Sequence, residues 1–351
     1  MESEIYTDAC DMENSVIRLS FILPVYNVEK YIARCLDSIY ALPIGIEQFE
    51  VICIDDCSTD NSIAVIKEYQ LRYANLHLLH HKSNARQGAA RNTGIRYAKG
   101  VYCMFVDADD TLSQFDVIKL MMYMQKNDIE LLLGKANVIA NNGNISIWGN
   151  PPAHESAILR GPEIFINEDI HRIAFGVVWL AIYKMELVRR TRPFLENVQY
   201  EDTDWTLPCA YTARRLQYMP IILYNYHINS DTTTTTKSLQ SLIERTKQSL
   251  RIYEWGLSTS DLHNEIMIAV EDYGTWNLRG LSGIIKYSFK ERRIFYTSFS
   301  KSEFRTIAKW KGGNYTKLLV RFPIASQIVL ILLRPIYVLC KLLKNFIRKQ
   351  S

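Results

Sequence analysis

The sequence of 351 residues lacks the patterns that mark a disulfide-stabilised, secreted or membrane-spanning chain. Its seven cysteines are an odd number without a CxxC pair, which favours buried reduced thiols over a disulfide framework or a zinc site. Residues 1–15 are acidic and hold no apolar run, so we expect no secretory signal there. The longest uncharged apolar stretch, between Arg321 and Arg334, has 12 residues, whereas a membrane-spanning helix needs roughly 18–20. These absences predict a body that lies in the cytoplasm.

Acidic residues are absent from the C-terminal end. Residues 304–351 contain ten basic residues and no acidic one, although the formal net charge of the whole chain is only +4. The remainder holds 31 basic and 37 acidic residues and is therefore mildly acidic. Because the excess basic charge is confined to one end, we expect no nucleic-acid partner.

The overall composition excludes fibrous and disordered classes of protein. Hydrophobic residues make up 48% of the chain and charged residues 22%, as in ordinary globular proteins. A chain of this length can bury a large core, and we expect one large domain with an appendage, or two domains.

Short apolar runs alternate with amphipathic stretches over residues 16–134. The expected strands are 16–25, 49–54, 76–80, 101–106 and 129–133, and the expected helices are 28–40, 61–73, 85–98 and 114–126. This alternation predicts an α/β fold with a doubly wound, mostly parallel sheet, in which ligands bind beyond the carboxyl ends of the strands. Residues 135–235 are less regular, with a turn at 141–144 between strand-like runs, and residues 238–300 are expected to be helical.

Polar residues follow the first two expected strands. Pro24 is expected to stop the first strand, and Asn27 to cap the helix after it. Asp55 and Asp56 end the second strand, and adjacent carboxylates repel each other, so a ligand explains them better than stability does. Helix capping by the neighbouring Ser58 is compatible with this but does not account for the two aspartates.

Two further groups follow the third and fourth strands. Residues 88–90 are small and allow close helix packing, while Arg91 offers a bidentate donor suited to a phosphate or a pyrimidine edge. Asp107, Asp109 and Asp110 are three carboxylates in four residues, which repel strongly unless a cation neutralises them. Hard oxygen ligands suit Mg²⁺ or Mn²⁺, whereas the spacing of a calcium-binding EF-hand loop is absent.

Taken together, these groups resemble the motifs of the family 2 glycosyltransferases. The matching segments, in order, are PVYN at 24–27, IDDCSTD at 54–60, AARNTG at 89–94, VDADD at 106–110 and YEDTDW at 200–205. Trp179 and the Tyr-Asn-Tyr triplet at 224–226 are similar to the acceptor-side elements of that family. The resemblance implies the GT-A fold with a helical C-terminal extension, and an inverting enzyme of the bacterial surface-polysaccharide type.

The resemblance also implies a domain organisation. A catalytic GT-A domain would cover 16–235, with a nucleotide-sugar-binding half at 16–134 and an acceptor half at 135–235. Outside it would lie an N-terminal tail at 1–15, a helical extension at 236–317 and a basic tail at 318–351.

Donor-binding roles carry over from the family residue by residue. The implied donor-binding set is Pro24, Tyr26, Asp55, Asp56, Arg91, Asp107 and His227. Within it, Asp56 would accept a hydrogen bond from uracil, Arg91 would support the base or phosphate, and Asp107 would lie near the ribose. Asp109 would ligate Mn²⁺ or Mg²⁺ on the diphosphate, and Asp110 would only orient its neighbours.

The catalytic roles fall on the later acidic motif. Asp202 would be the base and Glu201 its support, with Asp204 as a rival base that points away from Asp202 on a helix.

Three positions depart from the family pattern. Arg86 and Cys57 stand where glycine is common, and His227 where an arginine often follows the Tyr-x-Tyr element. His227 is either a weaker, pH-dependent contact to the leaving diphosphate or a purely structural histidine.

The implied reaction moves a sugar from a nucleotide-diphosphate sugar, in particular a UDP-sugar, to a hydroxyl of a lipid-linked or growing oligosaccharide acceptor. A nucleotidyltransferase would carry a glycine-rich phosphate loop after the first strand, which PVYNVEK is not. A catalytically degenerate glycan-binding or scaffold subunit is the other alternative, and the intact aspartates at 56, 107, 109 and 202 argue against it.

The basic tail, residues 318–351, has the pattern of an interfacial helix. Basic side chains recur every seven residues at Arg334, Lys341 and Arg348, and apolar ones at Leu332 and Leu339. This predicts attachment to an anionic membrane surface, and thus a peripheral location on the inner face of the cell membrane. The alternative is packing on the catalytic domain or on a twin subunit, which leaves a homo-oligomer open.

Overall fold

The computed structural model describes residues 18–149, 151–167, 176–229, 238–259, 267, 288–300, 302–303 and 306. The chain divides into two compact units, residues 1–230 and 231–351.

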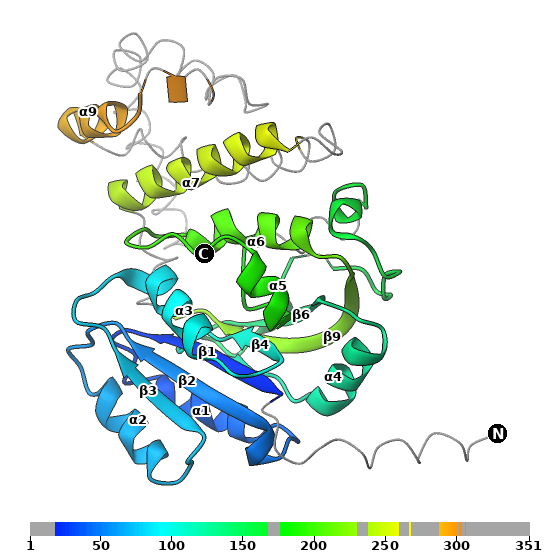
Figure 1. The fold of residues 1–351 in the computed structure, drawn as a ribbon. Helices are drawn as coiled ribbons and strands as arrows, with labels where there is room; N and C mark the ends of the chain where they lie inside the picture. Colours follow the sequence, from blue (N-terminus) through cyan, green and yellow to red (C-terminus); the bar gives the residue numbers. More distant parts are fainter. Residues whose placement is uncertain are drawn as a thin grey trace, which may run out of the picture. The chain divides into compact units, whose positions relative to one another are not determined.

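Four parallel strands form the N-terminal half of a sheet in the first unit (Figure 1). β1 (Leu19–Val25) lies between β2 (Phe49–Asp55) and β4 (Tyr102–Phe105), and β3 (Leu76–His80) lies beyond β2. Every residue of β1, β2 and β4 is buried, as expected for continuous apolar strands covered on both faces. The predicted doubly wound α/β arrangement is therefore confirmed.

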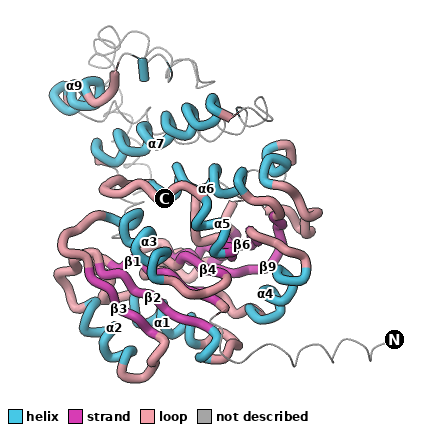
Figure 2. Tube along the Cα trace, in the orientation of Figure 1, coloured by secondary structure: helices cyan, strands magenta, loops and turns pink. Residues whose placement is uncertain are grey.

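Helices cover both faces of this half (Figure 2). α1 (Ile32–Tyr40) packs with α2 (Ser62–Gln70), while α3 (Arg86–Tyr97) packs with α5 (Met185–Arg190) and α6 (Glu201–Thr212). The chain winds from β1 outward to β3 and then returns through α3 to β4. The switch point of a doubly wound sheet therefore lies at the carboxyl ends of β1 and β4.

The second half of the sheet is mixed. The full strand order is β3-β2-β1-β4-β8-β6-β9-β5, with β7 paired to β6. Its strands are β5 (Thr111–Leu112), β6 (Leu131–Ile139), β7 (Ile145–Ile147), β8 (Ala181–Lys184) and β9 (Leu216–His227). β9 runs parallel to β6, whereas β8 is antiparallel to both β4 and β6. The remaining elements of this unit are η1 (Ile46–Gln48), α4 (Val117–Lys126) and η2 (Gly161–Phe165).

The turn expected at 141–144 is confirmed as the connection between β6 and β7. These strands pair in antiparallel register, and Gly143 has a φ of 82° with its N–H donating to the carbonyl of Ala140. A positive φ at the turn is easily adopted by glycine, which is why this short polar segment predicted a hairpin.

Two local expectations at the end of β1 were wrong. β1 continues through Pro24 to Val25, which still pairs with Asp55. The carbonyl of Ile22 accepts from the N–H of Val106, on the β4 side, whereas the carbonyl of Val25 accepts from the N–H of Asp56, on the β2 side. Successive residues of the strand therefore face opposite neighbours, and the nitrogen of Pro24 faces the β4 side. Pairing with β4 has ended by then, so the missing N–H costs no ladder bond.

Asn27 does not cap α1. The helix begins at Ile32, and the residue before it, Tyr31, makes no side-chain capping bond. Asn27 has a φ of 53° and accepts a hydrogen bond from the N–H of Thr59 at 2.8 Å. Its side chain therefore ties the loop after β1 to the loop after β2.

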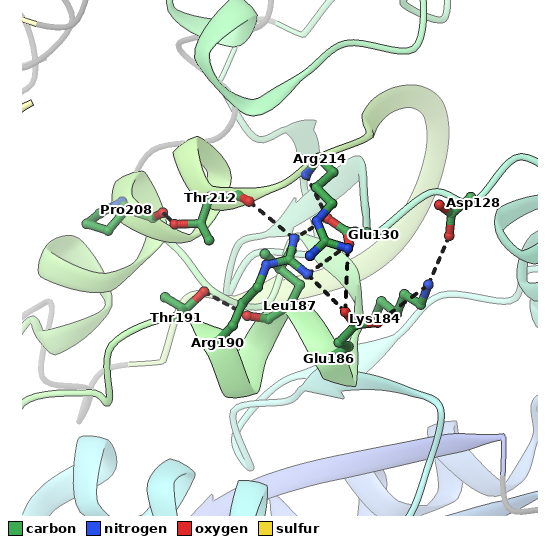
Figure 3. Close-up of polar contacts among 10 residues, drawn as sticks. All are labelled: Asp128, Glu130, Lys184, Glu186, Leu187, Arg190, Thr191, Pro208, Thr212 and Arg214. Carbon is green, nitrogen blue, oxygen red and sulfur yellow. Dashed lines mark hydrogen bonds and ion pairs between the residues drawn. The ribbon is translucent and has the colours of Figure 1, made fainter. Parts of the chain in front are cut away.

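A buried ion-pair network joins α5 to the start of β6 (Figure 3). Glu130, 2% exposed, accepts from both terminal nitrogens of Arg190 and from the main-chain N–H of Arg214. Arg190 also donates to the carbonyl of Thr212, at the end of α6. The network thus fixes the C-terminal end of α6 relative to the sheet.

Two capped helices lie in the described part of the second unit. α7 (Leu239–Ser258) begins at Ser238, whose side chain accepts from the N–H of Ser241, and α9 (Phe289–Thr297) begins with a capping box of Ser288 and Glu291. These helices agree with the expected helical segment. Within the described residues, no helix has the length and apolar content needed to cross a membrane. The predicted tails at 1–15 and 318–351 lie outside the described residues.

Candidate active site

Hydrogen bonds join the loops that follow β1, β2, β3 and β4. The loop after β1 bonds to that after β2, the loop after β2 to that after β3, and α1 to the loop after β4. The polar groups singled out in the sequence therefore lie together at the carboxyl edge of the parallel strands.

Tyr26 and Pro24 differ in their exposure at this edge. The side chain of Tyr26 is 49% exposed just beyond the end of β1, whereas Pro24 is buried within the strand. An exposed aromatic ring at the switch point is available for stacking on a flat ligand.

Asp55 and Asp56 are held by the protein itself. Asp55 accepts from the N–H of Ser58 at 2.9 Å, and its other oxygen lies 3.2 Å from Nδ1 of His80. Asp56 accepts from the N–H groups of residues 85 and 86 and lies 2.8 Å from Nδ1 of His81. Both carboxylates are at most 3% exposed. Hydrogen-bond partners within the protein therefore also account for these two carboxylates, beside the ligand that the sequence favoured.

Arg91 is buried between two carboxylates. It is 1% exposed, and its terminal nitrogens donate to Asp107, at 2.8 Å, and to Glu201. The resemblance implied that Arg91 supports the base or phosphate of the donor, and in the structure both terminal nitrogens of Arg91 donate to acidic partners. Arg91 therefore links the loop after β4 to the start of α6.

Close packing of α3 makes this link possible. A Cβ atom on Gly88 would overlap the main-chain oxygen of Leu195 and lie 3.0 Å from Cγ of Glu201. The small residues predicted to allow close packing therefore do so at the segment that carries Glu201.

The loop after β4 alternates between open and buried side chains. Asp107 and Asp109 are half-buried, whereas Ala108 and Asp110 are buried. Burial, together with the charge of Asp107, raises the pKa of Asp109 to about 6. Asp107 and Asp109 are thus two neighbouring carboxylates that remain partly accessible to a ligand.

Asp110 points into the fold. It accepts from the hydroxyl of Tyr224 at 3.0 Å and from the main-chain N–H of His227 at 2.7 Å. The Tyr224 hydroxyl also accepts from the N–H of Asp107. These bonds fix the loop after β4 against β9, which agrees with an orienting role for Asp110.

His227 is a neutral imidazole in this setting. Its Nε2 lies 3.0 Å from the hydroxyl of Thr111. Burial, with a smaller contribution from the charge of Arg34, lowers the pKa of His227 to about 4. A positive charge on His227 at neutral pH is therefore disfavoured.

Glu201 and Asp202 begin α6. Asp202 accepts from the N–H of Thr203 at 2.8 Å through one oxygen, and within the described residues its second oxygen has no protein partner. Burial and the adjacent charge of Glu201 raise the pKa of Asp202 to about 7. Asp204, by contrast, is 3% exposed and forms an ion pair with Arg192 at 2.8 Å. Asp202 is thus better placed than Asp204 to exchange a proton with a ligand.

Aromatic rings form a wall at the end of the mixed half. Trp179 stacks on Tyr224, with centroids 4.6 Å apart, and on Tyr226 at 5.8 Å. Trp148 packs edge-on against Trp179 and Tyr226. The predicted acceptor-side residues are therefore brought together, and they are joined by Trp148, which the sequence did not single out.

The family model described as Glycosyl transferase family 2 matches residues 20–191, which include the parallel strands and the loops that carry Asp56, Arg91 and Asp109. Residues 20–191 belong to this family. The resemblance of the four motifs at 24–27, 54–60, 89–94 and 106–110 is thereby confirmed, whereas the segments at 200–205 and 224–226 lie outside the match.

Relatives of this family 2 chain carry glycosyltransferase names. The chain is 30% identical over 223 residues to the uncharacterized glycosyltransferase YibD of Escherichia coli K12, covering 62% of the chain and 64% of YibD. It is 35% identical over 128 residues to the poly(ribitol-phosphate) beta-glucosyltransferase of Bacillus spizizenii, covering 36% of the chain and 20% of that protein. The chain therefore spans less than two thirds of the length of either relative.

A solved structure shows the same fold. Staphylococcus aureus TarS 1–349, solved in complex with UDP, superposes with a TM-score of 0.64 at 19% identity, covering 89% of this chain and 88% of that one. The same protein was also solved in complex with UDP-GlcNAc, with a TM-score of 0.61. At this identity the likeness shows the fold alone, and it confirms the GT-A fold predicted from the sequence.

The residues of this family 2 chain fit a divalent cation that is shared with a substrate. In the described part of the chain, no three His, Cys, Asp or Glu side chains form a complete metal cage. Mg²⁺ and Mn²⁺ commonly use one or two carboxylates together with substrate phosphates, which Asp107 and Asp109 can provide. Burial and the neighbouring charge of Asp107 raise the pKa of Asp109, and a bound cation would favour the charged form of both carboxylates.

Two contacts at the family 2 site were missed from the sequence. His81, next to Asp56, follows the third strand and would have been found by the same rule of strand ends. Arg34 donates to the main-chain oxygen of Asp109, but it lies on a helix 75 residues earlier and carries no local signal.

Proposed function

We propose that the chain transfers a sugar, with inversion, from a nucleotide-diphosphate sugar to a hydroxyl of a lipid-linked or growing oligosaccharide in surface-polysaccharide synthesis. The observation that carries the proposal is the connection of Asp202 to the loop after β4. Arg91 holds both Asp107 and Glu201, and Glu201 precedes Asp202. A proton acceptor and a carboxylate pair for a diphosphate-bound cation are thus built into one rigid frame.

Asp202 acts as the general base in this proposal. Its pKa of about 7 places it near half-deprotonated at neutral pH, where a carboxylate is a far better proton acceptor than at its ordinary value. The carboxylate oxygen of Asp202 that has no partner among the described residues accepts the proton of the acceptor hydroxyl as the hydroxyl oxygen attacks the sugar. Glu201 contributes by its charge, and Arg91 by holding Glu201 in place.

Asp107 and Asp109 hold the cation end of the donor. A bound Mn²⁺ or Mg²⁺ neutralises charge on the departing diphosphate. Asp110 and Tyr224 keep the loop in position, so that little reorganisation accompanies the reaction. Tyr26 offers its exposed ring to the nucleotide base, while Asp56 shapes that end of the site through residues 85 and 86.

UDP-sugars are the first donors to test, because UDP and UDP-GlcNAc are the ligands named for TarS 1–349. Thermal shift with UDP-, GDP- and dTDP-sugars, each with and without Mn²⁺, should show a Mn²⁺-dependent increase for UDP-sugars. No increase with any nucleotide sugar would contradict the proposal. Donor hydrolysis in the presence of Mn²⁺ separates an enzyme from a degenerate scaffold subunit.

Asp109→Ala tests the cation site directly. Calorimetry should show loss of Mn²⁺-dependent donor binding in this variant, because one of the two oxygen donors is removed. Glu68→Ala is the matched control, since Glu68 is an exposed carboxylate on α2. Unchanged affinity of Asp109→Ala in the presence of Mn²⁺ would remove Asp109 from the metal site.

A further inference from the structure

Arg34 is the second arginine that reaches the loop after β4. It lies on α1, and its Nη2 donates to the main-chain oxygen of Asp109 at 2.5 Å. The guanidinium also lies over the ring of Tyr31, 5.1 Å from the centroid. One hydrogen bond and one stacking contact therefore hold a half-buried cation beside a residue that we assign to the cation site.

The hydrogen-bonding capacity of Arg34 is largely unused. A guanidinium has five N–H donors, and the bond to Asp109 uses one of them. Its Nε is buried and has no hydrogen-bond partner within the described structure. A buried donor without a partner is costly, and at a functional site it points to a group supplied by a ligand.

Arg91 and His227, two other candidate cations in the described part of the site, are already accounted for. Arg91 is 1% exposed, and Asp107 and Glu201 occupy its terminal nitrogens. His227 is neutral at pH 7, although it stands where an arginine was expected from the family pattern. Neither residue therefore offers an unpaired positive charge to a departing diphosphate.

We propose that Arg34 contacts the diphosphate of the bound nucleotide and stabilises the charge that forms on it when the sugar leaves. An arginine on α1 thus takes the place of the one that β9 lacks. The planar fork of a guanidinium suits phosphate oxygens, and Tyr31 and the Asp109 carbonyl orient it in advance. The inference rests on the proposed function, since it assumes a nucleotide diphosphate as ligand.

The test compares ligands that differ in their phosphates. Full-length wild type and Arg34→Gln are titrated calorimetrically with Mn²⁺ alone, and then with UDP, uridine and pyrophosphate in the presence of Mn²⁺. We expect Arg34→Gln to weaken UDP and pyrophosphate on the order of 10–100-fold, the range of a charge-assisted hydrogen bond. Affinities for uridine and for Mn²⁺ alone should stay within about twofold, since neither probe offers a phosphate to the guanidinium.

Arg72→Gln is the matched control, because Arg72 likewise lies over the ring of the tyrosine three residues before it, Tyr69, but follows the end of α2. It should bind every probe as wild type does. Equal losses for UDP and uridine, or a loss of Mn²⁺ affinity as large as that for UDP, would show that Arg34 only supports the site and would overturn the proposal. Unchanged UDP affinity in Arg34→Gln overturns this inference alone. A wild type that binds neither UDP nor pyrophosphate overturns the inference and the UDP-donor proposal together.

Discussion

Glu201 and Asp202 are neighbours in the sequence, yet they have opposite surroundings. Glu201 is buried and paired with Arg91, whereas Asp202 is half-buried and keeps one oxygen without a partner among the described residues. Burial raises the pKa of both carboxylates, and the charge of Arg91 opposes this rise most directly at Glu201, to which Arg91 is hydrogen-bonded. This difference supports the proposal that Asp202 is the base and Glu201 its support.

Asp202→Asn should lower the rate of sugar transfer by about 10²–10⁴-fold, because general-base catalysis typically contributes that much. Donor affinity should change little, since Asp202 lies on α6 and not on the loop after β4. Transfer rates and calorimetric donor affinity, measured on the same preparation, test both parts. Near-normal transfer by the variant would show that another group is the base.

The rate of transfer should depend on pH through Asp202. Its pKa is raised to about 7, and the base must be deprotonated, so the rate should rise as the pH increases from about 6 to 8. A pH profile of kcat/KM at saturating Mn²⁺ measures this. A profile that is flat between pH 6 and 8 would contradict the assignment, as would an unchanged profile in Asp202→Asn.

The contact between Arg91 and Glu201 requires that α3 packs closely against the segment before α6. α3 can bring Arg91 to Glu201 because Gly88 leaves no side chain between the helix and the segment before α6. The contact is to a main-chain oxygen, which cannot move aside as the end of a flexible side chain can.

Gly88→Ala should therefore lower both stability and activity. We expect a loss of about 1–3 kcal/mol in the free energy of unfolding, typical of overpacking, and reduced transfer because Glu201 is displaced. Gly94→Ala, on the same helix, meets the side chains of Ile22 and Ile54 and serves as control. It should affect stability while leaving the pH profile of the remaining activity unchanged. Full activity and stability in Gly88→Ala would refute the packing argument.

The ion-pair network between Glu130 and Arg190 also joins separate elements of the fold. Burial by itself raises the pKa of Glu130, but hydrogen bonds from Arg190 and from the N–H of Arg214 outweigh it and hold that pKa below the ordinary 4.5. A depressed folded-state pKa means that the stabilisation is present above pH 4.5 and is lost as the pH falls through the folded-state pKa.

Glu130→Gln should reduce the free energy of unfolding at pH 7 by about 3 kcal/mol, because Arg190 loses its buried partner. Urea denaturation at pH 7 and at pH 4 measures the loss, which should shrink at the lower pH. Glu186→Gln is the control, since Glu186 is exposed and lies 3.7 Å from Arg190; it should cost less than about 1 kcal/mol. Equal effects of the two variants would argue against a special role for Glu130.

At the scale of the whole molecule, the basic charge of residues 318–351 contrasts with the acidic remainder. We expect the full chain to sediment with vesicles that contain phosphatidylglycerol but not with neutral phosphatidylcholine vesicles. Each basic residue near an anionic surface contributes about 1 kcal/mol, so replacing Arg334, Lys341 and Arg348 by Gln should weaken binding on the order of 100-fold. A chain that binds anionic vesicles equally well after deletion of 318–351 would disprove this membrane role.

Several features could be predicted from the sequence because they depend on local pattern. Buried strands read as continuous apolar runs, and strand ends mark the ligand edge of a doubly wound sheet, so the placement of Arg91, Asp107 and Asp109 at that edge followed directly. The turn between β6 and β7 was equally local. Pro24 was misjudged because its cost depends on whether a neighbouring strand is present, which local pattern does not show.

The sequence by itself determined the fold class, the family and the edge of the sheet where the carboxylates gather. Only the tertiary structure decided what each polar group does there. Asp56 is satisfied by the loop after β3, and Arg91 is used by Glu201, which lies 110 residues further along the chain. Arg34 reaches Asp109 from a helix whose sequence gives no hint of it. The physical reason is that hydrogen-bond partners and burial are set by contacts between distant segments, whereas periodicity and composition report only on neighbours in the chain.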